Sequence, residues 1–223
     1  MGTVRTYKLN PTQLMPNLPH VLLHYSNALS AEECNAAKAH DLFSSHGWDV
    51  KWVARYGPTQ PSHYHSTTHE AMAVLSGTAT LRFGAGDILV DGQVEGKEDG
   101  GIEIQAQPGD VFVLPAGLAH KTFNPSPETS RKFFKADEEA YQRSSGAKRE
   151  ALRHVDISGF TMIGAYPNGC QWNWADGGDD IGNFDKIWSI PTPSEDPVLG
   201  TSEQGLCGLW KAEGNFLPLL PAQ

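Results

Sequence analysis

Two short stretches of this sequence contain the kinds of side chain that bind transition metals in proteins. The first stretch contains His63, His65 and Glu70, and the second contains His120. Imidazole and carboxylate groups are ligands of divalent iron, manganese, nickel and zinc. Because four protein ligands leave room on an ion that binds more, the set predicts a metal centre that is open to a substrate.

The spacing inside the first stretch predicts a hairpin. His63 and His65 are two positions apart, so both side chains point to one face of an extended strand. Residues 66–69 are long enough for a turn before Glu70 opens the next strand. Without that turn, His69 would share the parity of the first two histidines and face inward in place of Glu70. We expect Glu70 as the ligand and His69 as a residue behind the ligands or at the pocket rim.

The second stretch predicts another turn and strand. Gly109 begins a turn, residues 111–114 form a short apolar strand, and residues 115–117 turn the chain again before His120. A single histidine in a strand is more often a hydrogen-bonded core or surface residue than a ligand. Four ligand types in this arrangement favour a metal centre, built from two hairpins that are far apart in the sequence.

The two stretches match the paired motifs of the cupin superfamily. The first has the pattern G-x5-H-x-H-x4-E-x6-G from Gly57 to Gly77, and the second has G-x5-P-x-G-x2-H-x3-N from Gly109 to Asn124. This resemblance implies a mainly β fold, a single cupin double-stranded β-helix (jelly-roll barrel) with a helix packed outside. It also implies one divalent transition metal per chain (Fe, Mn, Ni or Zn), whose ligands are His63, His65, Glu70 and His120.

Nearly the whole chain is also similar to the YjlB-type cupins, which are small and mostly uncharacterised proteins. The resemblance implies an RmlC-like barrel and a homodimer, because cupins of this size often pair through their outer sheets. The main departure is at residues 126–156, which are longer than the pattern suggests. The similar segments are His63–Glu70, Pro115–Lys121, Gly164–Pro167 with Gln171 and Trp172, and Asp196–Gly200.

The length and the turn-rich composition predict one domain that includes residues 1–223. We expect a barrel core at about residues 48–166, an N-terminal strand and helix within residues 1–47, and a C-terminal tail at residues 167–223 that wraps the barrel. The aromatic residues of such a tail are expected to hold it on the barrel surface rather than to bind substrate.

Two segments outside the motifs have patterns of their own. Ser30 and Glu33 match a capping box, which predicts a helix over residues 31–45 on the outside of the barrel. Residues 125–156 interrupt the strand pattern with prolines and charges, with helical character around residues 137–142. This insertion either caps the pocket or contacts a partner, or it is simply a solvated connection.

Three further residues could contact a substrate. Arg55 precedes the first motif and Lys121 follows His120, so either cation could meet the charge of a metal-bound substrate. Each is more often a surface cation. Met72 is two residues after Glu70 in the same strand, which predicts that it forms part of the apolar wall of the pocket.

Composition restricts the partners and the compartment. A formal net charge of −9 argues against nucleic acid, and no apolar run approaches the length of a membrane span. The three cysteines are widely spaced, which fits reduced thiols and a cytoplasmic protein without a secretory signal. The first six residues fit the minimal N-myristoylation pattern, but an ordinary N-terminus before a strand is the simpler interpretation.

The leading hypothesis for function is a metal-dependent oxygenase that acts on a small organic molecule bound directly to the metal. Ligand types alone do not choose the metal, because availability and geometry decide which ion is bound. A non-redox isomerase or lyase therefore remains an alternative, as does a non-catalytic protein that binds a small molecule. No nucleophile motif of a covalent enzyme is evident in the sequence.

Overall fold

The computed structural model describes residues 3–136 and 145–211 of the chain. The expectations about the N-terminal glycine and about helical character around residues 137–142 therefore lie outside the described residues, as does the end of the tail. Within the described part of the chain, no helix combines the length and the apolar character that crossing a membrane requires.

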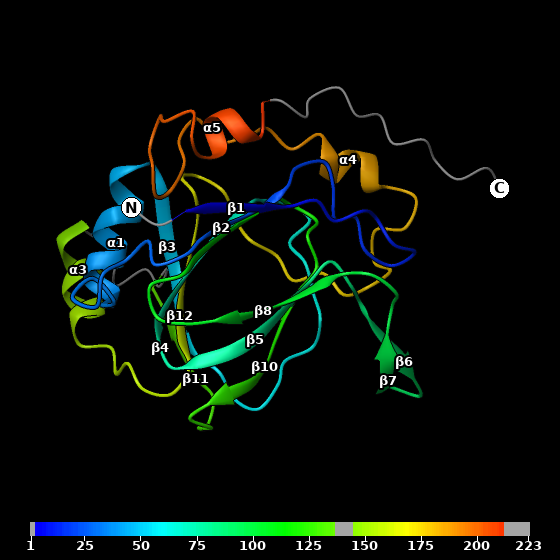
Figure 1. Ribbon diagram of the computed structural model, residues 1–223, viewed down its shortest axis with the longest axis horizontal. Helices are drawn as coiled ribbons and strands as arrows, with labels where there is room; N and C mark the ends of the chain where they lie inside the picture. Colours follow the sequence, from blue (N-terminus) through cyan, green and yellow to red (C-terminus); the bar gives the residue numbers. More distant parts are fainter. Residues whose placement is uncertain (1–2, 137–144, 212–223) are drawn as a thin grey trace.

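The mainly β prediction is confirmed, and every paired strand is antiparallel. The larger sheet has seven strands in the order β1-β2-β9-β4-β12-β3-β11. Their bounds in that order are Val4–Tyr7, Leu22–Tyr25, Val111–Leu114, Glu70–Ser76, Thr161–Pro167, Trp48–Arg55 and Lys132–Lys135. The large sheet curves over a smaller one to form the barrel (Figure 1).

The smaller sheet has three strands in the order β10-β5-β8, with bounds His120–Ser126, Thr78–Phe83 and Ile102–Ala106. A separate hairpin, β6 and β7 (Asp87–Val90 and Gln93–Lys97), projects from one end of the barrel (Figure 1). The helices are α1 (Ala36–Ser45), α3 (Ser145–Arg153), α4 (Phe184–Trp188) and α5 (Leu206–Leu209).

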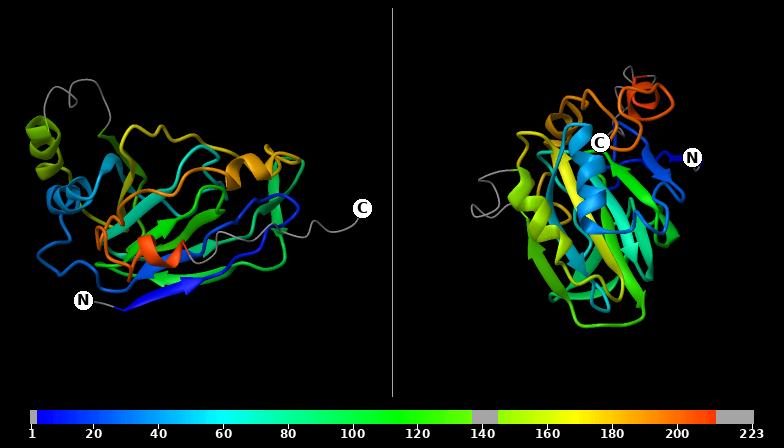
Figure 2. Two further views of the ribbon diagram at one scale, coloured as in Figure 1. Left: turned by 90° about the horizontal axis from the view of Figure 1, so that it is seen from above. Right: turned by 90° about the vertical axis from the view of Figure 1, so that its left-hand side faces the viewer.

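Strand β4 shows how the sequence builds two cores around one sheet. Met72 and Val74 point into the core between the two sheets, whereas Ala71 and Ala73 belong to a second core on the outer face. The helices α1 and α3 lie over that outer face (Figure 2). Because both faces of the strand are covered, it consists of apolar residues between Glu70 and Ser76 at its ends.

The helix outside the barrel is shorter than predicted. Its N-cap is Asn35, whose side-chain oxygen accepts hydrogen bonds from the backbone N–H groups of Ala37 and Lys38. Glu33 does accept a hydrogen bond from the Ser30 backbone N–H, at 2.8 Å, as a capping box requires. This contact closes a separate turn that precedes the helix, so the predicted start at residue 31 is wrong by five residues.

The described residues of the insertion at 125–156 include a strand and a helix, so this part of it is not simply a solvated connection. Its residues 132–135 form β11, which pairs with β3 at the edge of the large sheet. Helix α3 then packs beside α1, and Lys148 donates hydrogen bonds to Asp49 at 2.5 Å and to the Val50 carbonyl at 3.1 Å. The strand escaped the sequence analysis because a charged, four-residue edge strand has too little apolar alternation to be recognised.

Candidate metal centre

The two motifs meet through backbone hydrogen bonds. His63 and His120 form an antiparallel bridge, in which the His63 N–H donates to the His120 carbonyl at 3.1 Å and the reciprocal bond measures 2.8 Å. The Gly117 N–H donates to the His65 carbonyl at 2.8 Å. As a result, one ring nitrogen from each of these three buried histidines lies within 4.8 Å of the others. This cluster could hold a metal ion.

Each of the three rings is oriented by a backbone carbonyl. The Nδ1 atom of His63 is 3.2 Å from the Pro61 carbonyl oxygen, and that of His120 is 3.1 Å from the Leu118 carbonyl oxygen. The Nδ1 atom of His65 contacts the carbonyl oxygen of Asn173. When Nδ1 carries the proton and donates it to a carbonyl, the Nε2 lone pair is left for a metal ion.

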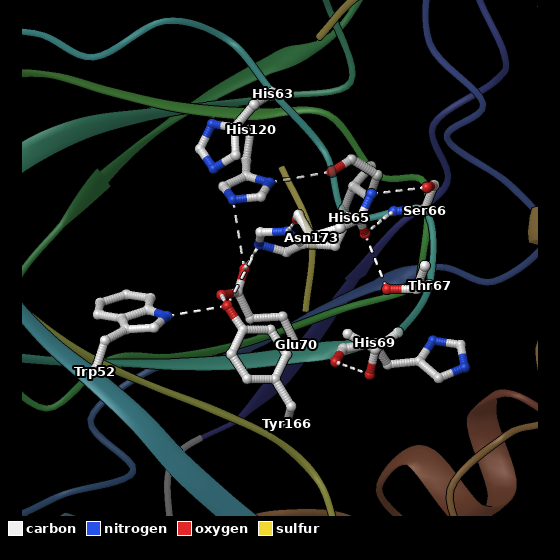
Figure 3. A network of polar contacts seen from close by, with 12 residues as sticks. Trp52, His63, His65, Ser66, Thr67, His69, Glu70, His120, Tyr166 and Asn173 are labelled. Carbon is white, nitrogen blue, oxygen red and sulfur yellow. Dashed lines mark hydrogen bonds and ion pairs between the residues drawn. The ribbon is translucent and has the colours of Figure 1, made fainter. Parts of the chain in front are cut away.

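Glu70 lies beside two of the three histidines, with one of its two carboxylate oxygens directed at them. Its Oε2 atom is 3.3 Å from His65 Nε2 and 3.4 Å from His120 Nε2. No hydrogen-bond donor among the described residues serves this buried oxygen. Figure 3 shows the carboxylate and the imidazoles directed toward one another. A buried carboxylate oxygen without a donor is costly, and a cation between it and the imidazoles would satisfy it.

The other carboxylate oxygen is held by a chain of hydrogen bonds. The Tyr166 hydroxyl donates to Glu70 Oε1 at 2.5 Å, and the Trp52 indole N–H donates to the same hydroxyl at 2.9 Å (Figure 3). Tyr166 comes from β12 and Trp52 from β3, the two strands that follow β4 across the sheet. The sheet itself therefore fixes the direction of the carboxylate.

The electrostatics favour the protonation states that bind metals. Burial lowers the pKa of His63 well below its ordinary value, with a contribution from the neighbouring histidines, and lowers that of His120 to about 4. Burial alone would also lower the pKa of His65, but the Glu70 carboxylate outweighs it and raises that pKa. Burial would raise the pKa of Glu70, whereas His65 and His120 hold it below its usual value. The carboxylate is thus ionised and the His63 and His120 rings are neutral, as metal binding requires, whereas Glu70 favours the protonated form of His65 while no cation is bound.

The cluster opens into a cavity of about 330 Å³. Besides the four candidate ligands, the lining residues are Trp52, Ala54, Arg55, Tyr56, Gln60, Met72, Arg131, Phe133, Lys135, Tyr166, Trp172 and Trp174. A larger hollow of about 780 Å³ lies elsewhere, between β1, α1 and the tail, and none of the four candidate ligands lines it. The chemistry therefore points to the smaller cavity.

Two of the three residues expected to contact a substrate lie in the cavity wall. Met72 lines it, as does Arg55, whose guanidinium also donates to Ser158 at 2.7 Å and to Asp156 at 3.2 Å. Lys121 does not line it, since its ammonium pairs with Asp87 at 2.9 Å. The parity of a strand explains this correction, because Lys121 follows His120 and points to the opposite face.

His69 does not line the cavity, so of its two expected places the pocket rim is wrong, and a place behind the ligands stays a prediction. Its ring points away from the cluster (Figure 3). Its Nδ1 atom accepts a hydrogen bond from the Ala116 N–H at 3.0 Å, and its Nε2 atom is 3.2 Å from the Pro191 carbonyl oxygen. His69 thus connects the turn of the second motif to the tail, and the predicted turn before Glu70 does reverse the parity.

The tail takes part in the site, contrary to the expectation for its aromatic residues. Ala175 exchanges two backbone hydrogen bonds of 3.0 Å each with Tyr64. Tyr64 lies between His63 and His65 in the sequence. The Asn173 side chain accepts from the Ser66 N–H at 3.0 Å. Trp174 stacks on the His63 ring with centroids 3.5 Å apart. We call residues 172–175 the strap.

Sequence reasoning missed the strap and Tyr166 for different reasons. Trp172 and Trp174 have the same parity, which is the signal that could have placed both on one face of an extended segment. No local pattern shows which strand lies opposite that segment. Tyr166 lies in a recognisable strand, but its partner Glu70 is 96 residues away in the sequence.

Comparisons with known proteins agree with this architecture. The cupin domain family matches residues 52–134. The "Uncharacterized protein YjlB" of Bacillus subtilis (strain 168) is 27% identical over 209 residues, which cover 92% of this chain and 96% of that protein. These matches support a protein of the cupin superfamily. Within that superfamily the protein is YjlB-like.

Two solved structures illustrate the more distant matches. RmlC from Streptococcus suis, in complex with dTDP-D-xylose, is 8% identical with a TM-score of 0.32, and the match covers 74% of this chain and 70% of that one. Hydroquinone 1,2-dioxygenase PnpCD, in complex with Cd2+ and 4-hydroxybenzonitrile, is 14% identical with a TM-score of 0.28. That match covers 55% of this chain and 59% of the dioxygenase chain, which is less than two thirds of its length.

Proposed function

We propose that this chain is a metal-dependent enzyme that holds one divalent transition metal ion with His63, His65, Glu70 and His120. The observation that carries the proposal is the buried Glu70 Oε2 atom, which faces the ring nitrogens without a hydrogen-bond donor among the described residues. The carbonyl contacts at the Nδ1 atoms support it further, because an Nδ1 proton donated to a carbonyl leaves the Nε2 lone pair for a metal ion.

The reaction that we favour is oxygenation of a small organic molecule. A redox-active divalent ion in this site would supply the activation of dioxygen and of a substrate oxygen. The chain itself contributes a cavity of about 330 Å³ that has the size of a small organic molecule. Tyr166 holds the carboxylate in place, and the stacked Trp174 restrains His63 and covers one side of the cluster.

The first test is the metal itself. Protein purified without added metal is analysed for its elements, and the metal-free protein is then titrated with iron(II) and with zinc. We expect one ion per chain in the wild type and almost none in the double variant His63→Ala/His65→Ala. The control is His154→Ala, because that side chain is 76% exposed and does not line the cavity of the candidate metal centre. Full metal content in the double variant would refute the ligand assignment.

The second test separates oxygenation from the alternatives. Iron-loaded and zinc-loaded proteins are incubated with phenolic, enolic and sugar-derived compounds, with and without dioxygen. An oxygenase consumes dioxygen with turnover and loses activity with zinc, whereas an isomerase or lyase works without dioxygen and tolerates a redox-inert ion. A non-catalytic binding protein leaves every compound unchanged. Undiminished turnover in the absence of dioxygen would exclude our favoured reaction.

We also propose that residues 1–223 form a single cupin domain. Supporting this, one core cluster contains Leu23 from the N-terminal segment, Val50 from the barrel and Trp210 from the tail. A cytoplasmic homodimer is proposed from the resemblance to other cupins and from the three free cysteines. Sedimentation of the purified protein tests the dimer.

A further inference from the structure

The cavity beside the candidate metal centre has flat aromatic walls. Tyr166 and Trp172 stack with centroids 6.0 Å apart and ring planes within 6° of each other. Trp52 and Phe133 form a second pair at 6.2 Å and 27°. All four side chains line the same cavity, together with Trp174. Aromatic walls favour planar, conjugated ligands, which stack on them or meet them edge to face.

The cavity lining has few of the side chains that usually bind the hydroxyl groups of a ligand. Among the described residues that line the cavity there is one carboxamide, Gln60, and no serine, threonine, asparagine or aspartate. A sugar or another polyhydroxylated molecule would need partners for each of its hydroxyl groups, since an unpaired buried polar group is costly. The lining therefore suits a molecule that has few polar groups apart from those that approach the metal centre.

Strand β11 adds positive charge to one side of the cavity. Phe133 pairs with Ala54 and Lys135 with Trp52, so these side chains share the inner face of the sheet. Arg131 precedes Phe133 by two positions and also lines the cavity. The strand and the residue before it thus place a phenyl ring between two cations, while Lys132, which lies between Arg131 and Phe133 in the sequence, faces the other way.

These two cations are available to a ligand. Arg131 and Lys135 are exposed, and neither side chain has a hydrogen bond or ion pair with another residue that the structure describes. Arg55 differs, since Asp156 and Ser158 already bind its guanidinium. Among the lining residues that the structure describes, Glu70 is the one acidic residue, and it faces the candidate metal centre. A positive rim in a chain of net charge −9 is a local feature that attracts anions.

We propose that the cavity binds a planar aromatic molecule that carries an anionic group. The ring lies among Trp52, Phe133 and Trp172, and the anionic group pairs with Arg131 and Lys135 at the mouth. This inference rests on the proposed function, because it names the substrate class of the same site. It adds a specific role for β11, which contains no candidate ligand of the metal.

Four small probe molecules separate the contribution of an aromatic ring to the binding affinity from the contribution of a negative charge. Benzoate is an aromatic anion, benzamide is its neutral counterpart, benzylamine is an aromatic cation and cyclohexanecarboxylate is an anion without an aromatic ring. Binding is measured by calorimetry and by ligand-observed NMR. We expect benzoate to bind about tenfold more tightly than benzamide, since two exposed ion pairs contribute a factor of that order. Benzylamine and cyclohexanecarboxylate should bind more weakly than benzoate.

Variants then assign these preferences to residues of β11. Arg131→Gln/Lys135→Gln should reduce benzoate affinity to that of benzamide and leave benzamide unchanged. Phe133→Leu should weaken both aromatic probes. The matched control is Lys132→Gln, which removes a cation from the same strand but from its opposite face, where its nearest carboxylate is that of Asp156 at 3.9 Å. Circular dichroism verifies that each variant is folded.

The outcomes also separate this inference from the proposed function. Each titration is run on metal-free and on zinc-loaded protein, with the metal content measured independently. A protein that binds no metal but ranks the probes as expected refutes the proposed function and supports the aromatic-anion cavity. The inference is overturned if benzoate does not bind, if cyclohexanecarboxylate equals it, or if the Arg131→Gln/Lys135→Gln variant binds it as the wild type does.

Discussion

Glu70 has two carboxylate oxygens with different surroundings. Oε1 accepts a hydrogen bond from the Tyr166 hydroxyl, whereas Oε2 faces His65 and His120 and has no donor among the described residues. One oxygen is thus used for orientation, which leaves the other for a cation. Groups that orient a metal ligand typically change metal affinity by about 10–100-fold when they are removed.

Replacing the tyrosine tests this division directly. Tyr166→Phe should lower the affinity for zinc by about 10–100-fold, because the carboxylate loses the bond that aims it. It should also destabilise the metal-free protein by about 1–3 kcal/mol, since Glu70 Oε1 then lacks its donor. Competition with a chromophoric chelator and denaturant unfolding measure the two effects. Tyr56→Phe is the control, as its hydroxyl lies in the same cavity wall without a hydrogen bond to a described residue. Equal zinc affinity in both variants would contradict the assignment.

Glu70 and His69 are neighbours in the sequence with separate roles. Substitution of Glu70 should mainly lower metal affinity, and substitution of His69 should mainly lower stability. Glu70→Gln removes the charge and should reduce metal affinity by more than Tyr166→Phe does. His69→Gln should leave metal affinity within about tenfold but lower stability, because its ring connects Ala116 to Pro191. Chelator competition and thermal unfolding measure these effects on the same samples. A large loss of metal affinity only in His69→Gln would show that the ligand register is wrong.

At the scale of elements, the start of α1 shows how a correct local pattern can be assigned to the wrong structure. The capping-box contact from Ser30 to Glu33 is present, but it closes a turn. Asn35 caps the helix instead. Both residues have the chemistry of an N-cap, and only the packing of the helix on the barrel decides between them.

Replacing Asn35 and replacing Ser30 should therefore change the stability of the protein by different amounts. Asn35→Ala should destabilise the protein by about 1 kcal/mol, because the first-turn N–H groups of α1 lose their acceptor. Ser30→Ala should change stability by less than about 0.5 kcal/mol, because the backbone N–H at that position still reaches Glu33. Denaturant unfolding gives both values. The assignment of the cap fails if Ser30→Ala is the more destabilising of the two.

The elements also show what could be predicted from the sequence. The ligands and the strands that carry them follow from a period of two and from the spacing of turns within each motif, as with His63 and His65. The strap and β11 could not be placed, because their positions depend on pairing with segments far away in the sequence. Several aromatic and cationic residues of the cavity wall come from these two elements, so the sequence predicted that the three histidines lie together but not the composition of this wall.

At the scale of the whole molecule, the buried histidines extend beyond the metal centre. His20 stacks on Trp210 with centroids 4.7 Å apart and lies 6.2 Å from His69. Its Nε2 atom is 3.4 Å from the Thr192 hydroxyl. Burial lowers the pKa of both histidines to about 4. These rings therefore help to fasten the tail while they are neutral.

This predicts how stability depends on pH. Histidine in the unfolded chain binds a proton near pH 6.5, whereas the folded protein binds it only near pH 4, so the free energy of unfolding should fall as the pH decreases between these values. Each such group contributes at most about 1.4 kcal/mol per pH unit. Denaturant unfolding of metal-free protein between these pH values measures the slope. His20→Gln should reduce it, and His154→Gln should not, since that ring is 76% exposed. An unchanged slope in His20→Gln would contradict the prediction.

The stack of Trp174 on His63 has an optical consequence. The indole is 43% exposed, unlike Trp48 and Trp210, which are 1% exposed, so we expect its emission at longer wavelength than theirs. Its ring is in contact with a candidate ligand, with centroids 3.5 Å apart and planes within 3°. A paramagnetic ion held by His63 would quench this red-shifted emission, while a closed-shell ion would not. The protein thus carries its own fluorophore at the site, and the kinetics of loading can be followed without a label.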